Sequence, residues 1–331
     1  MPSIRYLAAR IRRMDTARMR TVARELAAKA GKPAPLLFLD MIYCGFRYGA
    51  GYMDYRLFEF YNRTAAQRAT YLTRGKSNAL CLRFNDRERA ALVEDKLEFC
   101  KRFRAFLGRD WLDAEAASDA ELAAFTRKHP VFFAKTRNDC CGTGVRRVEA
   151  GEQAPQALRR ALLQAGFALW EEPIVQHPAM AALCPLCVNT YRVVTLLEGD
   201  MVHILKVFLR MGNGGHVDNL NAGGFAAPVD AVTGRITLPA ADKEGVCYTV
   251  HPATGAEILG FQAPLWQECL AMVRRAALVE PQVRYLGWDV AITAETPMLV
   301  EANTMPGNDI TQMPAHTPGG VGMLPLFEKF L

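Results

Sequence analysis

Three side chains near the C-terminus combine residue types and a spacing that suit a metal ion. Two predicted strands, Leu286 to Ile292 and Met298 to Ala302, are joined by a short turn and should pair as a hairpin. Because side chains alternate between the faces of a strand, Glu301 and Asn303 share a face, and the hairpin can bring Asp289 opposite them. Magnesium takes such oxygen ligands together with phosphate oxygens. The hairpin therefore predicts magnesium bridging protein and triphosphate, although an exposed polar face of an edge hairpin would have the same pattern.

A second candidate is a predicted strand, Val131 to Lys135, which leads into a loop with Gly142 and Gly144. A lysine at a strand end holds its ammonium over the sheet, and glycines let backbone N–H groups approach phosphate oxygens. An ordinary hairpin whose lysine reaches solvent has the same pattern. Two other nucleotide motifs fail. Gly75-Lys76-Ser77 lacks the earlier glycine of a phosphate-binding loop and is interpreted as a turn, and the third glycine of Gly-x-Gly-x-x-Gly is missing after Gly144.

In their types and their order, these motifs resemble the ATP-grasp superfamily, over roughly residues 90 to 315. The resemblance is closer to its bacterial subgroup of sugar-transfer-associated ATP-grasp proteins, and the hairpin matches the family's Asp and Glu-x-Asn metal signature. It implies an α+β fold in which two lobes clasp ATP and two Mg²⁺ ions. It further implies nucleotide contacts by Lys96, Lys135, Gly142, Gly144, Glu171, Glu172, Val175 and His177, phosphoryl or substrate contacts by Arg192, Lys206 and Arg210, and a substrate side formed by Asn189, Asn219, Asn221, Gly223 and Gly224.

Within that resemblance, the two lysines would reach the α and β phosphates, beneath a glycine-rich flap formed by residues 138–144. Cys140-Cys141 departs from the small residues that are usual in the flap. The backbone from Glu172 to Val175 would pair with the adenine edge, and His177 or Gln176 would reach the ribose.

The elements that must position these residues divide the chain at about residue 88. Residues 1–88 are predicted to be a largely helical, aromatic-rich extension, and 89–331 an ATP-grasp domain with a nucleotide lobe at about 129–175 and a metal and substrate lobe at about 176–331. Apolar periodicity predicts helices over 3–29, 86–107, 114–127, 154–166 and 263–280, an irregular segment over 36–61, and further strands over 192–197 and 202–209. The fold class is α+β with largely antiparallel sheets.

Charge and cysteine content narrow the function classes. The chain has 331 residues, 50% hydrophobic, and nine scattered cysteines, an odd number that argues against a disulfide-stapled secreted fold. No apolar run is long enough to span a membrane, so we expect a soluble, cytoplasmic protein. Residues 1–32 carry seven arginines and two lysines against two acids, a net charge of +7. The whole chain has a net charge of +6, so the remaining residues carry −1. A balanced main body argues against nucleic-acid binding. The basic helix can make a peripheral membrane contact or can dock on its own protein.

The resemblance implies an ATP-dependent ligase. A carboxylate would attack the γ phosphate, and an amine or similar nucleophile would displace phosphate from the acyl phosphate. Small-molecule or sugar-linked carboxylates and amines, in cell-surface polysaccharide synthesis, are the substrates that the subgroup suggests. Two alternatives stay open, a phosphotransferase acting on a hydroxyl and a non-catalytic nucleotide-binding scaffold. Cys184 and Cys187 lack the second cysteine pair of a zinc finger and are interpreted as structural. The sequence does not indicate the oligomeric state.

Overall fold

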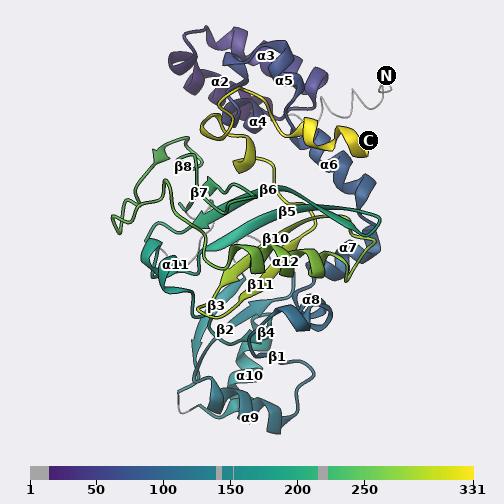
Figure 1. Ribbon diagram of the computed structural model, residues 1–331, viewed down its shortest axis with the longest axis vertical. Coiled ribbons are helices and arrows are strands. Elements are labelled where there is room, and N and C mark those ends of the chain that lie inside the picture. The colour runs from purple at the N-terminus through teal and green to yellow at the C-terminus, as the bar shows by residue number, and fades with distance from the viewer. Residues whose placement is uncertain (1–14, 139–143, 152, 215–222) are drawn as a thin grey trace.

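The computed structural model describes residues 15–138, 144–151, 153–214 and 223–331. It is elongated, with helices of the N-terminal region at one end, a large sheet in the middle and a small sheet at the other end (Figure 1). The C-terminal segment returns to the N-terminal helices (Figure 1). The N-terminal region consists of α2 (Thr16–Ala30), α3 (Ala34–Tyr48), α4 (Tyr52–Leu57), η1 (Phe60–Asn62), α5 (Ala65–Ala69) and α6 (Arg74–Phe84).

In the described residues, the strands form two antiparallel sheets. The small sheet has the order β1 (Trp111–Asp113), β4 (Phe167–Glu171), β2 (Val131–Thr136) and β3 (Val145–Glu149), and the large sheet has the order β11 (Pro297–Asn303), β10 (Tyr285–Ile292), β5 (Thr190–Glu198), β6 (Met201–Met211), β7 (Phe225–Pro228), β8 (Ala240–Ala241) and β9 (Cys247–Tyr248). The remaining helices are α7 (Arg87–Glu94), α8 (Lys96–Arg102), η2 (Arg104–Phe106), α9 (Asp119–Lys128), α10 (Pro155–Gln164), α11 (Pro178–Leu183), α12 (Trp266–Ala277), η4 (Ile310–Gln312), η5 (Pro314–His316) and η6 (Leu324–Phe330).

One face of the large sheet is closed by a hydrophobic core. Odd-numbered β5 residues such as Tyr191 and Val193 pack there with Trp288 of β10 and with α12, which contributes Trp266 and Val273. On the opposite face, one end is covered by α6 and the C-terminal helix, where Val194 and Leu196 meet residues such as Leu80 and Phe327. The uncovered part of that face carries the polar side chains described below.

The small sheet has the same division into an apolar and a polar face. Phe132, Ala134 and Trp170 pack against α9 and α10. Their neighbours in the alternating pattern, Lys135 and Glu171, therefore lie on the other face, toward the large sheet. Helix α8 belongs to the hydrophobic cluster that connects β4 with the large sheet. The two polar faces thus meet between the sheets.

The aromatic-rich stretch over 36–61 was expected to be irregular, and this prediction is wrong. It holds α3, α4 and the start of η1, and Tyr55, Phe58 and Phe60 of this stretch form a fully buried aromatic cluster with Tyr71. Aromatic residues obscured the helical period because both faces of α3 are apolar. Gly75-Lys76-Ser77 lies in α6 and not in a turn, and Gly75 allows a close approach to Gly49, since a Cβ at position 75 would lie 2.9 Å from the Gly49 carbonyl oxygen.

Two predicted helices are interrupted by caps. The helix expected over 86–107 ends at Glu94, because Asp95 leaves the helical conformation and accepts hydrogen bonds from the N–H groups of Leu97 and Glu98 at the start of α8. The helix expected over 114–127 begins at Asp119, where Ser118 and Glu121 form a capping box.

The N-terminal helix ends as predicted, with Gly31 in the left-handed conformation at φ 61°. Its described part begins at Thr16, because Asp15 is a non-helical cap that accepts from the N–H of Arg18 at 2.8 Å. The expected portion before residue 15 lies outside the described residues. The predicted strands of the hairpin and of β2, β5 and β6, and the helices α10 and α12, are confirmed to within a few residues. Among the described residues, none of the helices has both the length and the apolar character needed to cross a membrane.

Candidate active site

A row of side chains crosses four strands of the large sheet on its polar face. Glu301 is the register partner of Asp289, Asp289 that of Arg192, and Arg192 that of Phe208. Residues directly opposite each other in antiparallel strands point to the same face. The predicted pairing of Asp289 with Glu301 in the hairpin is therefore confirmed.

The neighbouring rows add charged groups to the same face. Arg210 is opposite Thr190, two residues from Arg192 along β5, and Lys206 is opposite Val194, two residues in the other direction. Asn303 lies opposite Gly287, two residues from Asp289. The structure thus brings together the three predicted cations and the three predicted metal ligands, whose roles stay predictions.

Asp289 is the centre of this group. Its side chain is 4% exposed and pairs with both nitrogens of one guanidinium edge of Arg192, with Nη2 to Oδ2 at 2.9 Å. Arg210 Nη1 donates to the same Oδ2 at 2.8 Å. Burial alone would raise the pKa of Asp289, but the charges of Arg192 and Arg210 outweigh it and hold this pKa well below its usual range.

Glu301 is in the opposite electrostatic situation. Burial raises its pKa, and the negative charge of neighbouring Asp289 raises it further, against smaller opposing effects from Lys135 and Arg192. Asn303 donates through Nδ2 to Glu301 Oε1 at 3.5 Å, which leaves its amide oxygen as a ligand. A divalent cation would reverse the effect on Glu301, because it compensates adjacent carboxylates. The residue types of Asp289, Glu301 and Asn303 therefore fit Mg²⁺, to which Asp289 would bind by sharing oxygens that now accept from Arg192 and Arg210.

Gly287 makes room for this arrangement. A Cβ at this position would lie 2.8 Å from Pro306 Cβ and 3.0 Å from Arg192 Cδ. The space is used by Arg192, whose Nη1 donates to the carbonyl of Pro306 at 2.9 Å. Arg192 thereby connects the hairpin of β10 and β11 to the chain segment that follows it.

Lys206 is a half-buried ammonium on the same face. Burial lowers its pKa, and no carboxylate among the described residues forms an ion pair with it. A half-buried cation of this kind is stabilised by an incoming anion, such as a phosphate group.

The facing surface of the small sheet contributes a second ion network. Glu171 is 3% exposed and pairs with Lys135 of β2 and with Arg109, which precedes β1. Arg109 also donates to the Leu299 carbonyl of β11 at 2.6 Å. Although burial acts to raise it, the charges of Arg109 and Lys135 lower the pKa of Glu171 to about 2. Arg109 therefore joins the two sheets beside the hairpin of β10 and β11. The sequence did not indicate this role, because no motif surrounds Arg109.

The predicted flap begins at the end of this network. Thr136 N–H donates to the Gly144 carbonyl at 3.0 Å, which closes the hairpin between β2 and β3. Lys96 is the first residue of α8, and its N–H donates to the Arg137 carbonyl at 3.0 Å. Both predicted lysines thus lie at the base of the flap, while Gly142 is outside the described residues.

Part of the segment predicted to bind adenine already forms hydrogen bonds within the protein. The N–H of Glu172 donates to the Asp110 carbonyl at 3.0 Å, and its carboxylate accepts from Asp110 N–H at 2.9 Å. The N–H of Glu172 is therefore not available to adenine, contrary to the prediction. Val175 lies in a segment without helix or strand and is 81% exposed. His177 caps α11, where its Nδ1 accepts from Ala179 N–H at 3.1 Å, so only its other ring nitrogen could reach a ribose.

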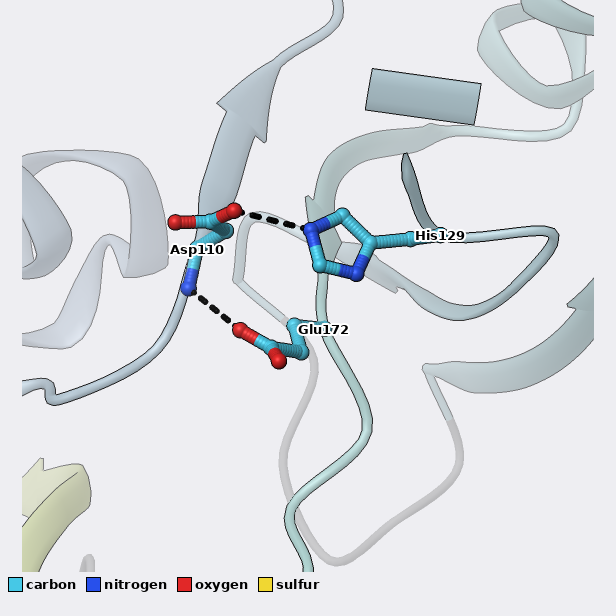
Figure 2. Close-up of side chains that lie close together, drawn as sticks. All are labelled: Asp110, His129 and Glu172. Carbon is cyan, nitrogen blue, oxygen red and sulfur yellow. Dashed lines mark hydrogen bonds and ion pairs between the residues drawn. The ribbon is translucent and has the colours of Figure 1, made fainter. Parts of the chain in front are cut away.

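Glu172 also belongs to a separate cluster of ligand-type side chains. Asp110, His129 and Glu172 each place one such atom within 4.8 Å of the others (Figure 2). His129 Nε2 lies 2.8 Å from Asp110 Oδ2, and Lys128 Nζ lies 2.5 Å from the same oxygen. Asp110 is already neutralised by these partners, and Glu172 accepts a backbone N–H, so the cluster is satisfied without an ion.

The predicted substrate side is only partly supported by the structure. Asn189 is fully buried, and its Nδ2 donates to Gln176 Oε1 at 3.0 Å and to the carbonyls of Met180 and Cys184 at 2.8 and 3.1 Å. It holds α11 against the start of β5, so its assignment as a substrate residue is wrong. Gly223 and Gly224 lead into β7, with Gly223 in the left-handed region at φ 87°. Asn219 and Asn221 lie outside the described residues.

The fold and this face of the large sheet define an α+β protein of the ATP-grasp class. Residues 160–326, half of the chain, match the model of the family described as sugar-transfer associated ATP-grasp, and the chain belongs to this family. The matched region contains Arg192, Lys206 and Arg210 of β5 and β6 and the whole hairpin of β10 and β11. A search of curated proteins finds no match.

Several solved structures are similar in fold. D-cycloserine synthetase DcsG has 12% sequence identity and a TM-score of 0.45, with 76% of this chain and 77% of that chain covered. D-alanine–D-alanine ligase from Bacillus anthracis has 11% identity and a TM-score of 0.42, with coverage of 76% and 72%. The ATP-grasp ligase PsnB, complexed with a minimal precursor, has 13% identity and a TM-score of 0.39, and the match covers 67% of this chain and 55% of that chain. The chain thus spans about half the length of PsnB.

Proposed function

We propose that the protein is an ATP-dependent ligase that activates a carboxylate as an acyl phosphate for attack by an amine or similar nucleophile. The observation that carries the proposal is the cluster of Arg192, Arg210 and Lys206 beside Asp289 and Glu301 on one sheet face. Cations next to paired carboxylates suit a transferring phosphoryl group, whose charge must be neutralised on all sides. Membership of the family supports ATP as the phosphoryl donor.

The residues of this chain would act by binding and positioning. Asp289, Glu301 and Asn303 would hold Mg²⁺, which when bound offsets the charge of the phosphates. Lys206 and the two arginines would neutralise the γ phosphate, while Lys135, now paired with Glu171, would exchange this partner for a phosphate oxygen. A carboxylate oxygen then attacks the γ phosphorus and ADP leaves. The nucleophile attacks the acyl carbon, and phosphate leaves.

The substrates that we propose are small-molecule or sugar-linked carboxylates and amines of cell-surface polysaccharide synthesis. The family description, which refers to sugar transfer, supports this context. We place the reaction in the cytoplasm, where ATP is available; the odd number of scattered cysteines suits a reducing compartment.

The test is turnover of Mg-ATP by the purified protein with pooled carboxylates and amines, followed by mass analysis. Hydroxylamine in place of the amine should trap the acyl phosphate as a hydroxamate. Glu301→Gln should abolish hydroxamate formation, whereas Glu295→Gln, an exposed change in the turn of the same hairpin, should leave it intact. Phosphate retained on a hydroxyl acceptor would identify a phosphotransferase instead. A Glu301→Gln protein with the wild-type rate, or stoichiometric ATP binding without turnover, would contradict the proposal.

A further inference from the structure

Helix α3 exposes apolar side chains on the side that faces away from the protein. Leu36, Leu39, Tyr43 and Phe46 are 59%, 60%, 51% and 40% exposed, and we call them the α3 stripe. Their spacing of three, four and three residues places them along one face of the helix over three turns. The buried residues of α3, among them Leu37, Met41 and Cys44, lie on the opposite face.

This pattern is unusual for a helix on a protein surface. Such a helix normally places polar side chains opposite its buried face. The only charged residues of α3 are Asp40 and Arg47. Asp40 is not part of the exposed face, because both its oxygens accept from the guanidinium of Arg68 at 2.8 Å. The exposed face of α3 is therefore apolar and carries no unpaired acid.

Exposed arginines lie on α3 and on the neighbouring helix α2, whose exposed acid, Glu25, forms an ion pair with Arg56 at 3.4 Å. Arg47 is exposed next to Phe46, at the C-terminal end of α3. On the other flank, Arg20 of α2 is exposed and lies 5.8 Å from the ring of Phe38. Arg18 and Arg24 of α2 are exposed as well. The sequence before α2 adds four more arginines, so residues 1–32 carry a net charge of +7.

We propose that the α3 stripe docks the protein on an anionic membrane surface. Leucine and aromatic side chains would enter the boundary between headgroups and acyl chains, and the flanking arginines would contact the anionic headgroups. A second copy of this chain is a poorer occupant, because it would bring two strongly basic N-terminal regions together. α3 lies at the end of the molecule remote from the small sheet, so docking through α3 would not involve the small sheet (Figure 1).

The experiment is co-sedimentation of the full-length protein with vesicles. Vesicles of phosphatidylcholine containing phosphatidylglycerol should bind the wild-type protein, and vesicles of phosphatidylcholine alone should bind it weakly. Leu39→Ser with Tyr43→Ser should lower the partition coefficient about tenfold or more, because two apolar side chains no longer enter the bilayer. Arg18→Gln with Arg24→Gln should lower binding to the anionic vesicles only.

Leu82→Ser is the matched control, because Leu82 is a leucine on another helix, α6, with 76% exposure. It should bind vesicles as the wild type does. Thermal unfolding checks that each variant is folded, and Leu36→Ser with Leu39→Ser replaces the first pair if that pair is unstable. Absence of wild-type binding to anionic vesicles, or unchanged binding by the stripe variants, would overturn the proposal. Dimerisation that the stripe substitutions abolish, without vesicle binding, would identify a second copy as the occupant and would also overturn it.

Discussion

Glu171 should make the stability of this protein depend on pH in a way that one substitution can isolate. Its carboxylate is buried between Arg109 and Lys135, and its pKa falls from 4.5 to about 2. Each pKa unit corresponds to about 1.4 kcal/mol, so the ionised side chain contributes on the order of 3 kcal/mol to the free energy of unfolding at neutral pH. Glu171→Gln should remove this contribution.

The sign follows from the lowered pKa in the folded state. The contribution is complete above pH 4.5, where the carboxylate is ionised in both states, and is lost as the pH falls toward 2, because the unfolded state takes up the proton first. At about pH 3, roughly 1 kcal/mol should remain. The free energies of unfolding of the wild type and the variant should therefore converge on acidification.

Urea unfolding at neutral pH and at about pH 3, followed by circular dichroism, measures the two differences. Glu149→Gln, which changes a 67% exposed glutamate on β3, controls for the loss of one negative charge at the surface. A gap between wild type and Glu171→Gln that stays the same at both pH values would refute the reasoning, because it would mean that the carboxylate is not held ionised by its two partners.

Three further substitutions test the site. Gly287→Ala should lower the free energy of unfolding by about 1–3 kcal/mol and impair Mg-ATP turnover, because the new Cβ meets Pro306 and displaces Arg192. A fully active and equally stable variant would show that Arg192 does not need the space that Gly287 leaves. Asp95→Ala should cost about 1 kcal/mol in urea unfolding through loss of the α8 cap, and unchanged stability would argue against that cap. Asn189→Ala should lower stability by about 1–3 kcal/mol, since buried carbonyls lose their donor, while the KM of the folded enzyme stays unchanged. A raised KM would return Asn189 to the substrate side.

The hairpin is the part of the site that could be predicted with the fewest assumptions. Side chains alternate along a strand, and a short turn limits the register, so the facing of Asp289 and Glu301 follows from local geometry. Lys135 and Glu171 were also identified, but from the order of motifs along the chain. Their direct ion pair was not foreseen, because it depends on the pairing of β2 with β4.

The predictions that failed did so because they depend on contacts between residues that are distant along the chain. Asn189 has the residue type of a substrate contact, yet α11 folds over it and takes up its hydrogen bonds. The backbone from Glu172 to Val175 was expected to pair with adenine, but the N–H of Glu172 is taken up by Asp110, which the pairing of β1 with β4 brings beside it. Polar groups in a buried position bind whichever partner the fold supplies.

Periodicity and neighbours along the chain suffice to specify the fold class, most of the strands and the hairpin on which Asp289, Glu301 and Asn303 share a face. The tertiary structure decided which charges neutralise one another. Arg192 and Arg210 meet Asp289 from strands β5 and β6, far from it in sequence, and Arg109 joins Glu171 to the backbone of β11. It also decided that α3, apolar on both faces, has only one of them covered. Burial and long-range pairing arise only when the sheets and helices pack, so no local pattern could specify them.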